Sequence, residues 1–326
     1  MRLAVLGSGM IVADLLSVSA AIPGLKLAAI FGRSPVMPRM EQLAAQYGIP
    51  RVYTDYEQCL ADVEVDAVYI GLPNSLHAEY ARRALLAGKH VICEKPFTLA
   101  VGELRELRAL AGQRRLILVE AITNQYLSNY RSIRQRLGEL GELKLIQCEY
   151  SQYSSRYPAF RAGQLLPAFD PAMGGGALMD LGIYTLHFVA GLLGRPRSIT
   201  YTPNLDRGVD TSGVAVLDYG TCTAVCVWAK DSAGPIRTKI QGTDGTLVMP
   251  GPPNVCDSYT IWRRGHEEEA VDVKVHPHRM VEEFRAFERM IQQLDLAERD
   301  TRLDHSQLVL DLATQALASA GIRLGA

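Results

Sequence analysis

The sequence predicts an α/β protein of two domains, in which a doubly wound parallel sheet precedes an α+β domain with a large, mostly antiparallel sheet. Up to about residue 121, short apolar runs alternate with helix-length segments, as in a parallel sheet covered by helices on both faces. Beyond about residue 142, strand patterns follow one another with few helices between them. A chain of 326 residues also exceeds the usual size of one domain. We therefore expect domains at residues 1–121 and 122–326.

The first domain is predicted from five apolar runs, each short enough to be a buried strand. They lie at residues 3–6, 27–31, 67–70, 90–93 and 116–119. Because parallel neighbours are joined by right-handed crossovers, the helical segments between the runs are expected to cover both faces of the sheet. This is the Rossmann architecture.

The second domain is predicted from a series of alternating strands. In the first of them, at residues 144–153, Ile146, Cys148 and Tyr150 share one face. Asp244-Gly245 is a hairpin signal. The other strands are expected at residues 214–219, 221–229, 236–241, 246–249, 258–263 and 270–275. Consecutive strands without crossover helices imply antiparallel pairing.

Three helices complete the second domain. One is expected at about residues 177–193, and two close the chain. Asp304 or Ser306 is expected to cap the last helix. The helix before it has an apolar stripe formed by Met280, Phe284, Phe287, Ile291 and Leu294.

Composition argues against highly charged partners and against a metal site. Lysine and arginine (34 residues) balance aspartate and glutamate (35 residues), so no global field favours nucleic acid or a membrane surface. No uninterrupted run of about 18 apolar residues predicts a membrane span. The six cysteines show neither C-x-x-C spacing nor clustering with histidines. We therefore expect reduced thiols, no metal and a cytoplasmic location.

A glycine turn follows the first apolar run. Gly7 and Gly9 allow a tight turn and a close backbone approach to a pyrophosphate, which the next helix stabilises through the free N–H groups at its N-terminus. We expect Gly7, Gly9, Met10 and Ile11 to bind a dinucleotide; a plain tight turn is the alternative. The third position of the motif, usually Gly or Ala, is Val12 and departs from it.

The cofactor preference is expected to be set where the second apolar run ends. An NAD-binding fold usually places a carboxylate there, on the ribose hydroxyls, but this sequence has Gly32-Arg33-Ser34. Arg33 with Ser34 could bind a 2′-phosphate, which favours NADP over NAD. The alternative is a solvated arginine in a loop.

Three further segments carry a family resemblance. Residues 71–77 (Gly-Leu-Pro-Asn-Ser-Leu-His) and Glu94-Lys95-Pro96 follow strands, at the edge where α/β sheets bind ligands. With Gly174-Gly175-Gly176 followed by Asp180, they closely resemble the Gfo/Idh/MocA family, named for glucose-fructose oxidoreductase and inositol dehydrogenase. His77 could instead cap a helix, and Glu94 could orient its loop or simply neutralise charge. The cofactor contacts expected in these segments are Leu72, Pro73, Asn74, His77, Glu94 and Lys95.

The resemblance implies that Lys95 is catalytic, because an ammonium beside the reacting oxygen stabilises a developing alkoxide. Tyr184 stands where many family members carry an acid/base histidine. A tyrosine at this position resembles the branch of the family that contains glucose-fructose oxidoreductase and the dihydrodiol and xylose dehydrogenases. A tyrosine has an unperturbed pKa of about 10, so it needs a cation such as Lys95 nearby.

Asp180, Tyr184 and His187 share one face of the expected helix. Asp180 is expected to orient the substrate or the Tyr184-Lys95 pair, and His187 to contact the substrate. The alternatives are a helix-terminal charge for Asp180 and a hydrogen-bonded core histidine for His187. Tyr153 and Arg156 suit a polyhydroxylated ligand or, equally, a structured loop.

These features predict an NAD(P)-dependent oxidoreductase that transfers a hydride between the nicotinamide and a secondary alcohol or carbonyl of a sugar, polyol or cyclic diol. Lys95, Tyr184 and Asp180 are the expected catalytic residues. Two alternatives are an NAD-dependent glycosidase with a transient redox cycle and a non-catalytic regulator that senses dinucleotide or sugar. A large sheet with one uncovered face also predicts a homodimer or homotetramer.

Overall fold

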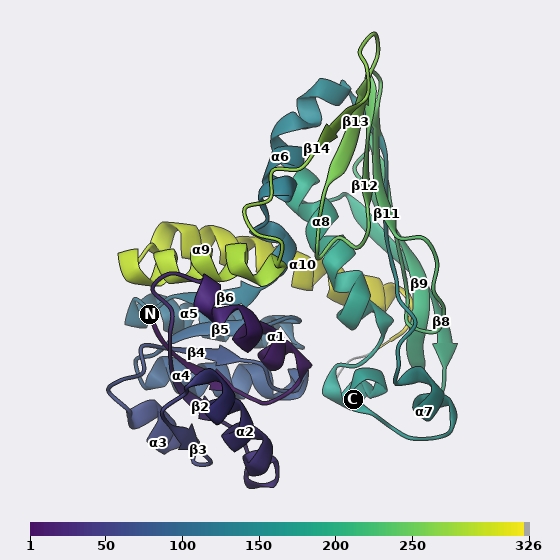
Figure 1. Cartoon of the computed structure of the whole chain (residues 1–326). Coiled ribbons are helices and arrows are strands. Elements are labelled where there is room, and N and C mark those ends of the chain that lie inside the picture. The colour runs from purple at the N-terminus through teal and green to yellow at the C-terminus, as the bar shows by residue number, and fades with distance from the viewer. Residues whose placement is uncertain (323–326) are drawn as a thin grey trace. The chain divides into compact units, whose positions relative to one another are not determined.

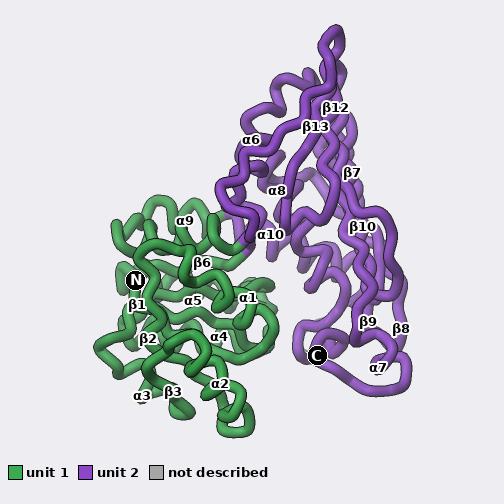
Figure 2. The backbone as a smooth tube through the Cα atoms, viewed as in Figure 1, with its two compact units in different colours: residues 1–121, 280–304 green, residues 122–279, 305–326 purple. Residues whose placement is uncertain are grey.

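The computed structural model describes residues 1–322, which form two compact units (Figure 2). The first unit holds residues 1–121 and 280–304, and the second holds residues 122–279 with the chain from residue 305 onward. The first break falls after residue 121, where the sequence places the domain boundary. Residues 280–304, which the sequence assigns to the second domain, lie in the first unit.

The first unit is built on a six-stranded sheet in the order β3-β2-β1-β4-β5-β6, with every neighbouring pair parallel. This is the order of a doubly wound dinucleotide-binding sheet, so the predicted fold class is confirmed for this unit. Strand β3 spans two residues, too few to form an apolar run, and the sequence does not predict it. The strands are β1 (Arg2–Leu6), β2 (Lys26–Phe31), β3 (Val52–Tyr53), β4 (Ala67–Ile70), β5 (His90–Glu94) and β6 (Leu118–Ala121).

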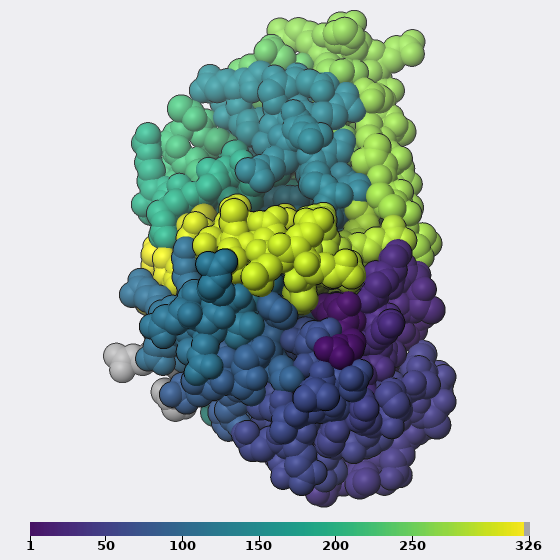
Figure 3. Space-filling model, turned by 90° about the vertical axis from the view of Figure 1, so that its left-hand side faces the viewer, coloured from purple at the N-terminus to yellow at the C-terminus, as the bar shows by residue number. Residues whose placement is uncertain are grey.

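Helices flank this sheet (Figure 1). They are α1 (Met10–Val18), α2 (Met37–Tyr47), α3 (Tyr56–Ala61), α4 (His77–Leu86), α5 (Val101–Arg114) and α9 (Arg279–Gln293). Helix α9 belongs to this unit because its apolar stripe packs there: the Phe284 ring meets Tyr69 of β4 edge-on, with 5.3 Å between ring centroids. Figure 3 shows α9 (yellow) beside the N-terminal residues (dark purple). Arg285 of α9 donates a hydrogen bond to the Ala21 carbonyl oxygen at 3.2 Å.

The last helix, α10 (Leu296–Ser319), begins before both residues that the sequence suggests as caps, so that prediction is wrong. Asp295 lies just ahead of the helix, and its carboxylate accepts the Glu298 N–H at 2.9 Å. Asp304 lies inside the helix and pairs with Arg108 at 2.6 Å.

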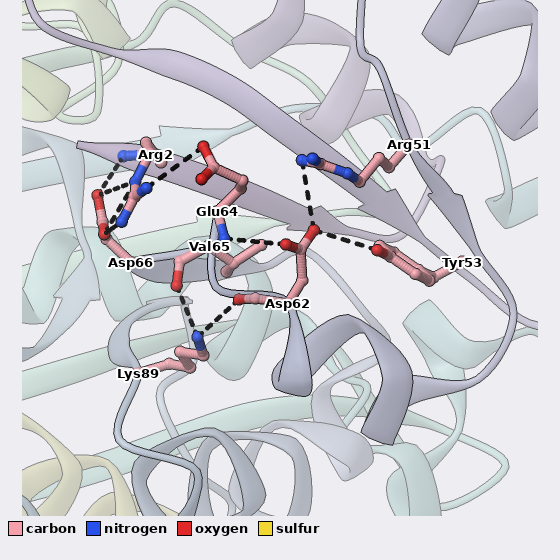
Figure 4. Close-up of polar contacts among 8 residues, drawn as sticks. All are labelled: Arg2, Arg51, Tyr53, Asp62, Glu64, Val65, Asp66 and Lys89. Carbon is pink, nitrogen blue, oxygen red and sulfur yellow. Dashed lines mark hydrogen bonds and ion pairs between the residues drawn. The ribbon is translucent and has the colours of Figure 1, made fainter.

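Charged side chains at the amino ends of the parallel strands are paired with one another (Figure 4). Arg2 binds Asp66 at 2.6 Å, and this hydrogen bond holds the pKa of Asp66 below its usual value. Lys89 donates to the Asp62 carbonyl oxygen at 2.9 Å, while Arg51 lies 3.4 Å from the Asp62 carboxylate. At this edge of the sheet, the charges and hydrogen-bonding groups of these residues are therefore compensated by one another.

The second unit is built on an eight-stranded sheet in the order β14-β13-β12-β11-β7-β10-β9-β8; among its described strands, only β7 and β10 pair in parallel. The predicted, mostly antiparallel sheet is confirmed. The sequence misses the edge strand β8, in which Pro203 and Asn204 weaken the strand pattern. The strands are β7 (Leu143–Ser151), β8 (Ser198–Asp206), β9 (Val209–Asp218), β10 (Thr223–Ala229), β11 (Arg237–Gly242), β12 (Gly245–Pro250), β13 (Tyr259–Arg263) and β14 (Glu269–Val271).

The central helix of this unit is not one continuous α-helix as expected. It starts as a π-helical turn, Leu178–Gly182, and continues as α8 (Ile183–Leu193). A Cβ at residue 182 would lie 2.6 Å from the Trp228 ring, so glycine lets the turn pack directly on the indole. By length and composition, Pro171–Leu193 could cross a membrane, yet 78% of its most apolar window is buried, as in a core helix.

Candidate active site

The glycine turn has the shape that the dinucleotide motif needs. Gly7 has φ +111°, and a Cβ there would lie 2.6 Å from the Gly71 carbonyl oxygen. Gly9 is exposed at the start of α1, with nothing within 4 Å of its Cβ position. Met10, 73% exposed, and the partly exposed Ile11 begin the helix. A pyrophosphate can therefore approach the free N–H groups of α1, and these residues fit a dinucleotide.

Val12, the departure from the glycine motif, is accommodated by a second glycine. Its side chain is fully buried, and its Cγ2 lies 2.8 Å from the point where a Cβ on Gly71 would stand. Residue 71 thus provides the space that the motif usually obtains from a small residue at position 12. Helix α1 can pack against β1 and β4 although the consensus is broken.

The residues expected to set the cofactor preference lie in solvent at the end of β2. Arg33 and Ser34 are both exposed. Arg33 precedes a short 3-10 turn, Ser34–Val36, and its carbonyl oxygen accepts the Val36 N–H at 3.0 Å. Gly32 is enclosed, since a Cβ there would lie 2.6 Å from the Met40 sulfur. The geometry leaves the guanidinium accessible to a ligand and to water.

His77 connects two loops from inside the unit. Its ring is fully buried; Nδ1 lies 2.9 Å from the Pro96 carbonyl oxygen and Nε2 lies 2.9 Å from the Leu72 carbonyl oxygen. Burial lowers the pKa of the imidazole, against the opposing effect of these two acceptors. Both ring nitrogens therefore contact backbone carbonyl oxygens inside the unit. On the same loop, Pro73 is exposed and Asn74 is partly exposed.

The loop that carries Lys95 is fixed by buried carboxylates. At the end of β5, Glu94 accepts a hydrogen bond from the Tyr69 hydroxyl at 2.6 Å and another from the Lys95 N–H at 3.3 Å. Glu120 of β6, 4% exposed, accepts the Phe97 N–H at 3.1 Å. The Lys95–Pro96 peptide bond is cis, and Lys95 itself is partly exposed. Glu94 thus contacts the loop backbone and Tyr69, and its expected roles remain predictions.

Tyr69 and Glu120 are not among the residues predicted from the sequence. Each lies in an apolar strand, at residues 67–70 and 118–121, where a polar group has no solvent to satisfy it. A carboxylate inside such a run was the available signal, because a buried carboxylate in a sheet requires donors close by.

Asp180 in the second unit is paired with a lysine that the sequence did not single out. Its side chain is 39% exposed, and Lys230 Nζ lies 2.9 Å from its carboxylate. Lys230 is 2% exposed, donates to the Ala168 carbonyl oxygen at 2.6 Å and lies 4.2 Å from the centre of the Phe169 ring. The only signal in the sequence was a lysine directly after an apolar strand.

Tyr184 and His187 are on the helix that follows the π-helical turn, and both side chains are buried, at 5% and 1% exposure. The Tyr184 ring lies 5.8 Å from the Tyr150 ring, and its carbonyl oxygen accepts a hydrogen bond from Asn124 at 2.9 Å. His187 Nδ1 lies 3.0 Å from His305 Nε2, so this histidine has the polar partner that a core histidine needs.

The two loop residues expected to contact substrate are at the surface. Tyr153 is 49% exposed and meets Tyr157 edge-on, with 5.8 Å between ring centroids. Arg156 is exposed directly before α7 (Tyr157–Arg161), and its N–H donates to Ser154 Oγ at 3.3 Å. These contacts give the segment local order and leave a ring edge and a guanidinium in solvent.

Comparison with known proteins extends over both units. The oxidoreductase family with an NAD-binding Rossmann fold matches residues 1–121, and the GFO/IDH/MocA C-terminal domain matches residues 130–248. A scyllo-inositol 2-dehydrogenase (NADP(+)) of Bacillus subtilis is 35% identical over 249 residues, 76% of this chain and 75% of that protein. A trans-1,2-dihydrobenzene-1,2-diol dehydrogenase of Homo sapiens is 30% identical over 280 residues, 82% and 79% of the two chains.

A solved structure gives the same relationship in three dimensions. A 3-ketoreductase from Actinomadura kijaniata, in complex with TDP-benzene and NADP, superposes with a TM-score of 0.82 at 26% identity, covering 99% of this chain and 98% of that one. The glycine turn, the Glu94-Lys95-Pro96 loop and the helix of Asp180 and Tyr184 thus lie in matching folds, and the predicted resemblance is confirmed. The chain belongs to the GFO/IDH/MocA family of oxidoreductases.

Proposed function

We propose that this oxidoreductase uses NADP to interconvert a secondary alcohol and a carbonyl group on a polyol, a sugar or a cyclic diol. The observation that carries the proposal is the placement of Lys95: its loop leaves the carboxyl end of β5, on the edge of the sheet where the glycine turn also lies. Relatives that act on scyllo-inositol, D-xylose and trans-1,2-dihydrobenzene-1,2-diol support this substrate class.

Each of the predicted site residues has a separate role in the proposed reaction. The bound nicotinamide supplies the hydride chemistry. In the oxidative direction, Tyr184 takes the proton of the reacting hydroxyl while the Lys95 ammonium stabilises the negative charge that develops on the oxygen. Asp180 accepts a hydrogen bond from the substrate and orients it. Gly7, Gly9 and the first N–H groups of α1 hold the pyrophosphate.

The preference for NADP over NAD is assigned to Arg33 with Ser34. Neither residue is a carboxylate that would repel a 2′-phosphate, and an exposed guanidinium beside the end of β2 can form a charge-assisted contact with one. The scyllo-inositol and D-xylose relatives are named for NADP(+), and the ketoreductase structure contains NADP.

The uncovered face of the eight-stranded sheet supports a homodimer or homotetramer. Val214 and Val216 of β9 are exposed there, and they pair across the strands with Val227 and Val225 of β10. A second copy of the chain would cover this apolar face. Light scattering at micromolar concentration tests it, since a particle of 35.8 kDa would show a monomer. All six cysteines are buried with free thiols, which suits a cytoplasmic enzyme.

The deciding experiment is an activity screen at 340 nm with NADP and NAD. Scyllo-inositol, D-xylose and a trans-dihydrodiol are offered for oxidation, and the corresponding carbonyl compounds for reduction. We expect net cofactor turnover with at least one of them, and faster turnover with NADP. Release of sugar from a glycoside without any net change at 340 nm would instead indicate the glycosidase alternative, and cofactor binding without turnover would indicate a regulator.

A further inference from the structure

We propose that Lys230 is a positioning residue for Asp180: its buried ammonium holds the carboxylate as an ionised, oriented acceptor for a substrate hydroxyl. The inference rests on the proposed function, in which Asp180 contacts the substrate. It deepens that function, because it says which chemical group on the substrate Asp180 can bind.

Lys230 is attached firmly to the sheet. It follows β10 directly, and its N–H donates to the Thr211 carbonyl oxygen in β9 at 2.8 Å. The side chain is 2% exposed, and its ammonium contacts the Ala168 carbonyl oxygen at 2.6 Å, the Phe169 ring at 4.2 Å and the Asp180 carboxylate at 2.9 Å. A lysine held at these points has lost most of its usual flexibility.

The two partners of the pair differ in exposure, and this points to function. A buried ammonium is costly unless a counter-charge and hydrogen bonds compensate it. Asp180 supplies the counter-charge, yet its side chain is 39% exposed. The carboxylate therefore presents part of its surface to solvent while the cation behind it fixes its charge and direction.

A second buried group holds the same turn through its backbone. The Asp210 carboxylate of β9, 4% exposed, accepts the Leu178 N–H at 2.7 Å and the Tyr201 hydroxyl at 2.8 Å. Gly176, with φ +130°, allows this approach, because a Cβ there would clash with Asp210. The π-helical turn is thus held at Leu178 by a buried carboxyl group and at Asp180 by a cation, both from the β9 and β10 region of the sheet. Burial raises the pKa of Asp210, and the nearby Lys230 ammonium opposes that rise.

The charge of the pair selects the substrate group. A carboxylate beside a fixed ammonium stays ionised, and an ionised carboxylate accepts hydrogen bonds but donates none. Asp180 therefore binds a hydroxyl donor on the substrate, such as the second hydroxyl of a diol. A ketone oxygen or an ether oxygen at that position would be repelled.

The test compares Lys230→Met, Lys230→Arg, Asp180→Asn and the double variant Asp180→Asn/Lys230→Met, on the substrate that is turned over in the screen. The matched control is Lys144→Met, which removes an exposed lysine of the same unit whose partner is Glu142. Steady-state constants are measured from about pH 5 to pH 10, together with the Kd for NADP and the melting temperature.

If the inference holds, Lys230→Met and Asp180→Asn each lower kcat/KM by about 10-fold to 100-fold, mainly through KM, and the Kd for NADP stays within about twofold. The double variant is no worse than Asp180→Asn, because the pair acts as a unit. Lys230→Met also moves the acid limb of the pH profile to higher pH, since the carboxylate loses its cation, and Lys230→Arg restores much of the activity.

Several results would overturn it. If Lys230→Met has the same kcat/KM and the same acid limb as the control Lys144→Met, the ammonium contributes only to packing. The same conclusion follows if the loss of kcat/KM in the double variant equals the product of the losses in the two single variants. If Lys230→Met does not fold, the double variant, which removes both charges, must still match Asp180→Asn. Wild-type kinetics in Asp180→Asn would remove the proposed role of Asp180 itself, whereas an impaired Asp180→Asn with a normal Lys230→Met rejects the inference alone.

Discussion

The two segments that carry the proposed catalytic groups are held in different ways. The loop after β5, which presents Lys95, is fixed through its backbone: Glu120 accepts the Phe97 N–H at 3.1 Å, and the Pro96 carbonyl oxygen lies 2.9 Å from His77. The π-helical turn that presents Asp180 has a backbone contact too, from the Leu178 N–H to Asp210 at 2.7 Å, but in addition its functional side chain is held by a charge, since Lys230 Nζ lies 2.9 Å from the Asp180 carboxylate.

The difference shows where each segment is sensitive. Backbone hydrogen bonds place the Lys95 loop as a whole, so changes beneath it should displace Lys95 without changing its charge. The contact between Lys230 and Asp180 sets a side-chain charge as well as a position, so a change there should alter the pH profile. The following predictions, ordered from the largest expected effect to the smallest, test this comparison.

Lys95→Met should abolish measurable turnover while the affinity for NADP stays within a few-fold, because the cation at the reacting oxygen is lost and the glycine turn is intact. Lys89→Met is the matched control at the opposite end of β5, where the ammonium donates to the Asp62 and Val65 carbonyl oxygens. It should lower the melting temperature and spare catalysis. Near-normal turnover in Lys95→Met would remove Lys95 from the mechanism.

Tyr184→Phe should slow the chemical step by about 10²-fold to 10⁴-fold, as expected for the loss of a general acid/base. Single-turnover kinetics measure this step apart from product release. Tyr219→Phe is the control, because that hydroxyl donates to the Gly194 carbonyl oxygen away from the proposed catalytic residues. An effect on KM alone would make Tyr184 a binding residue and His187 the better candidate for acid/base.

Substitutions of His77 should separate its two contacts. Asparagine reaches the position of Nδ1, beside the Pro96 carbonyl oxygen, whereas glutamine reaches that of Nε2, beside the Leu72 carbonyl oxygen. If the Lys95 loop is what His77 supports, His77→Gln should lower kcat by about tenfold and His77→Asn by less. The reverse order, measured on variants of similar melting temperature, would contradict this role.

Arg33→Ala should raise the Kd for NADP by about tenfold and leave the Kd for NAD unchanged, because a charge-assisted phosphate contact is lost. Arg33 is exposed, so the effect should shrink at high salt. Titration calorimetry with both oxidised cofactors at two salt concentrations measures it. Equal weakening of both cofactors would show that Arg33 does not contact the 2′-phosphate.

Arg2→Met should have the smallest effect, a slight loss of stability with normal catalysis, since Arg2 lies at the amino edge of the sheet. Arg2 lowers the pKa of Asp66, so the stability from this pair is present above the unfolded pKa and is lost as pH falls through the folded pKa. Melting temperatures of wild type and variant should therefore converge in acid. A constant difference from pH 7 to pH 3 would show that the loss is one of packing.

The sequence determined the features that depend on neighbouring residues. The turn at Gly7 could be predicted because a positive φ is a local requirement, and the position of Lys95 at the end of a strand because its short motif follows an apolar run that must be a buried strand. The period of the apolar residues was enough to place most strands and the change from parallel to antiparallel pairing. Such signals need no knowledge of which strands are neighbours in space.

Tertiary structure alone decided the features that depend on distant residues. Val12 departs from its motif, and the space for its side chain comes from Gly71, which follows β4, the neighbour of β1 in the sheet. Helix α9 packs into the first unit because Phe284 finds Tyr69 there. Lys230 faces Asp180 because strand pairing brings the end of β10 to the π-helical turn, and a single lysine after a strand carries no periodic signal. A buried ion pair is a relation between two positions, so it appears only when the chain is folded.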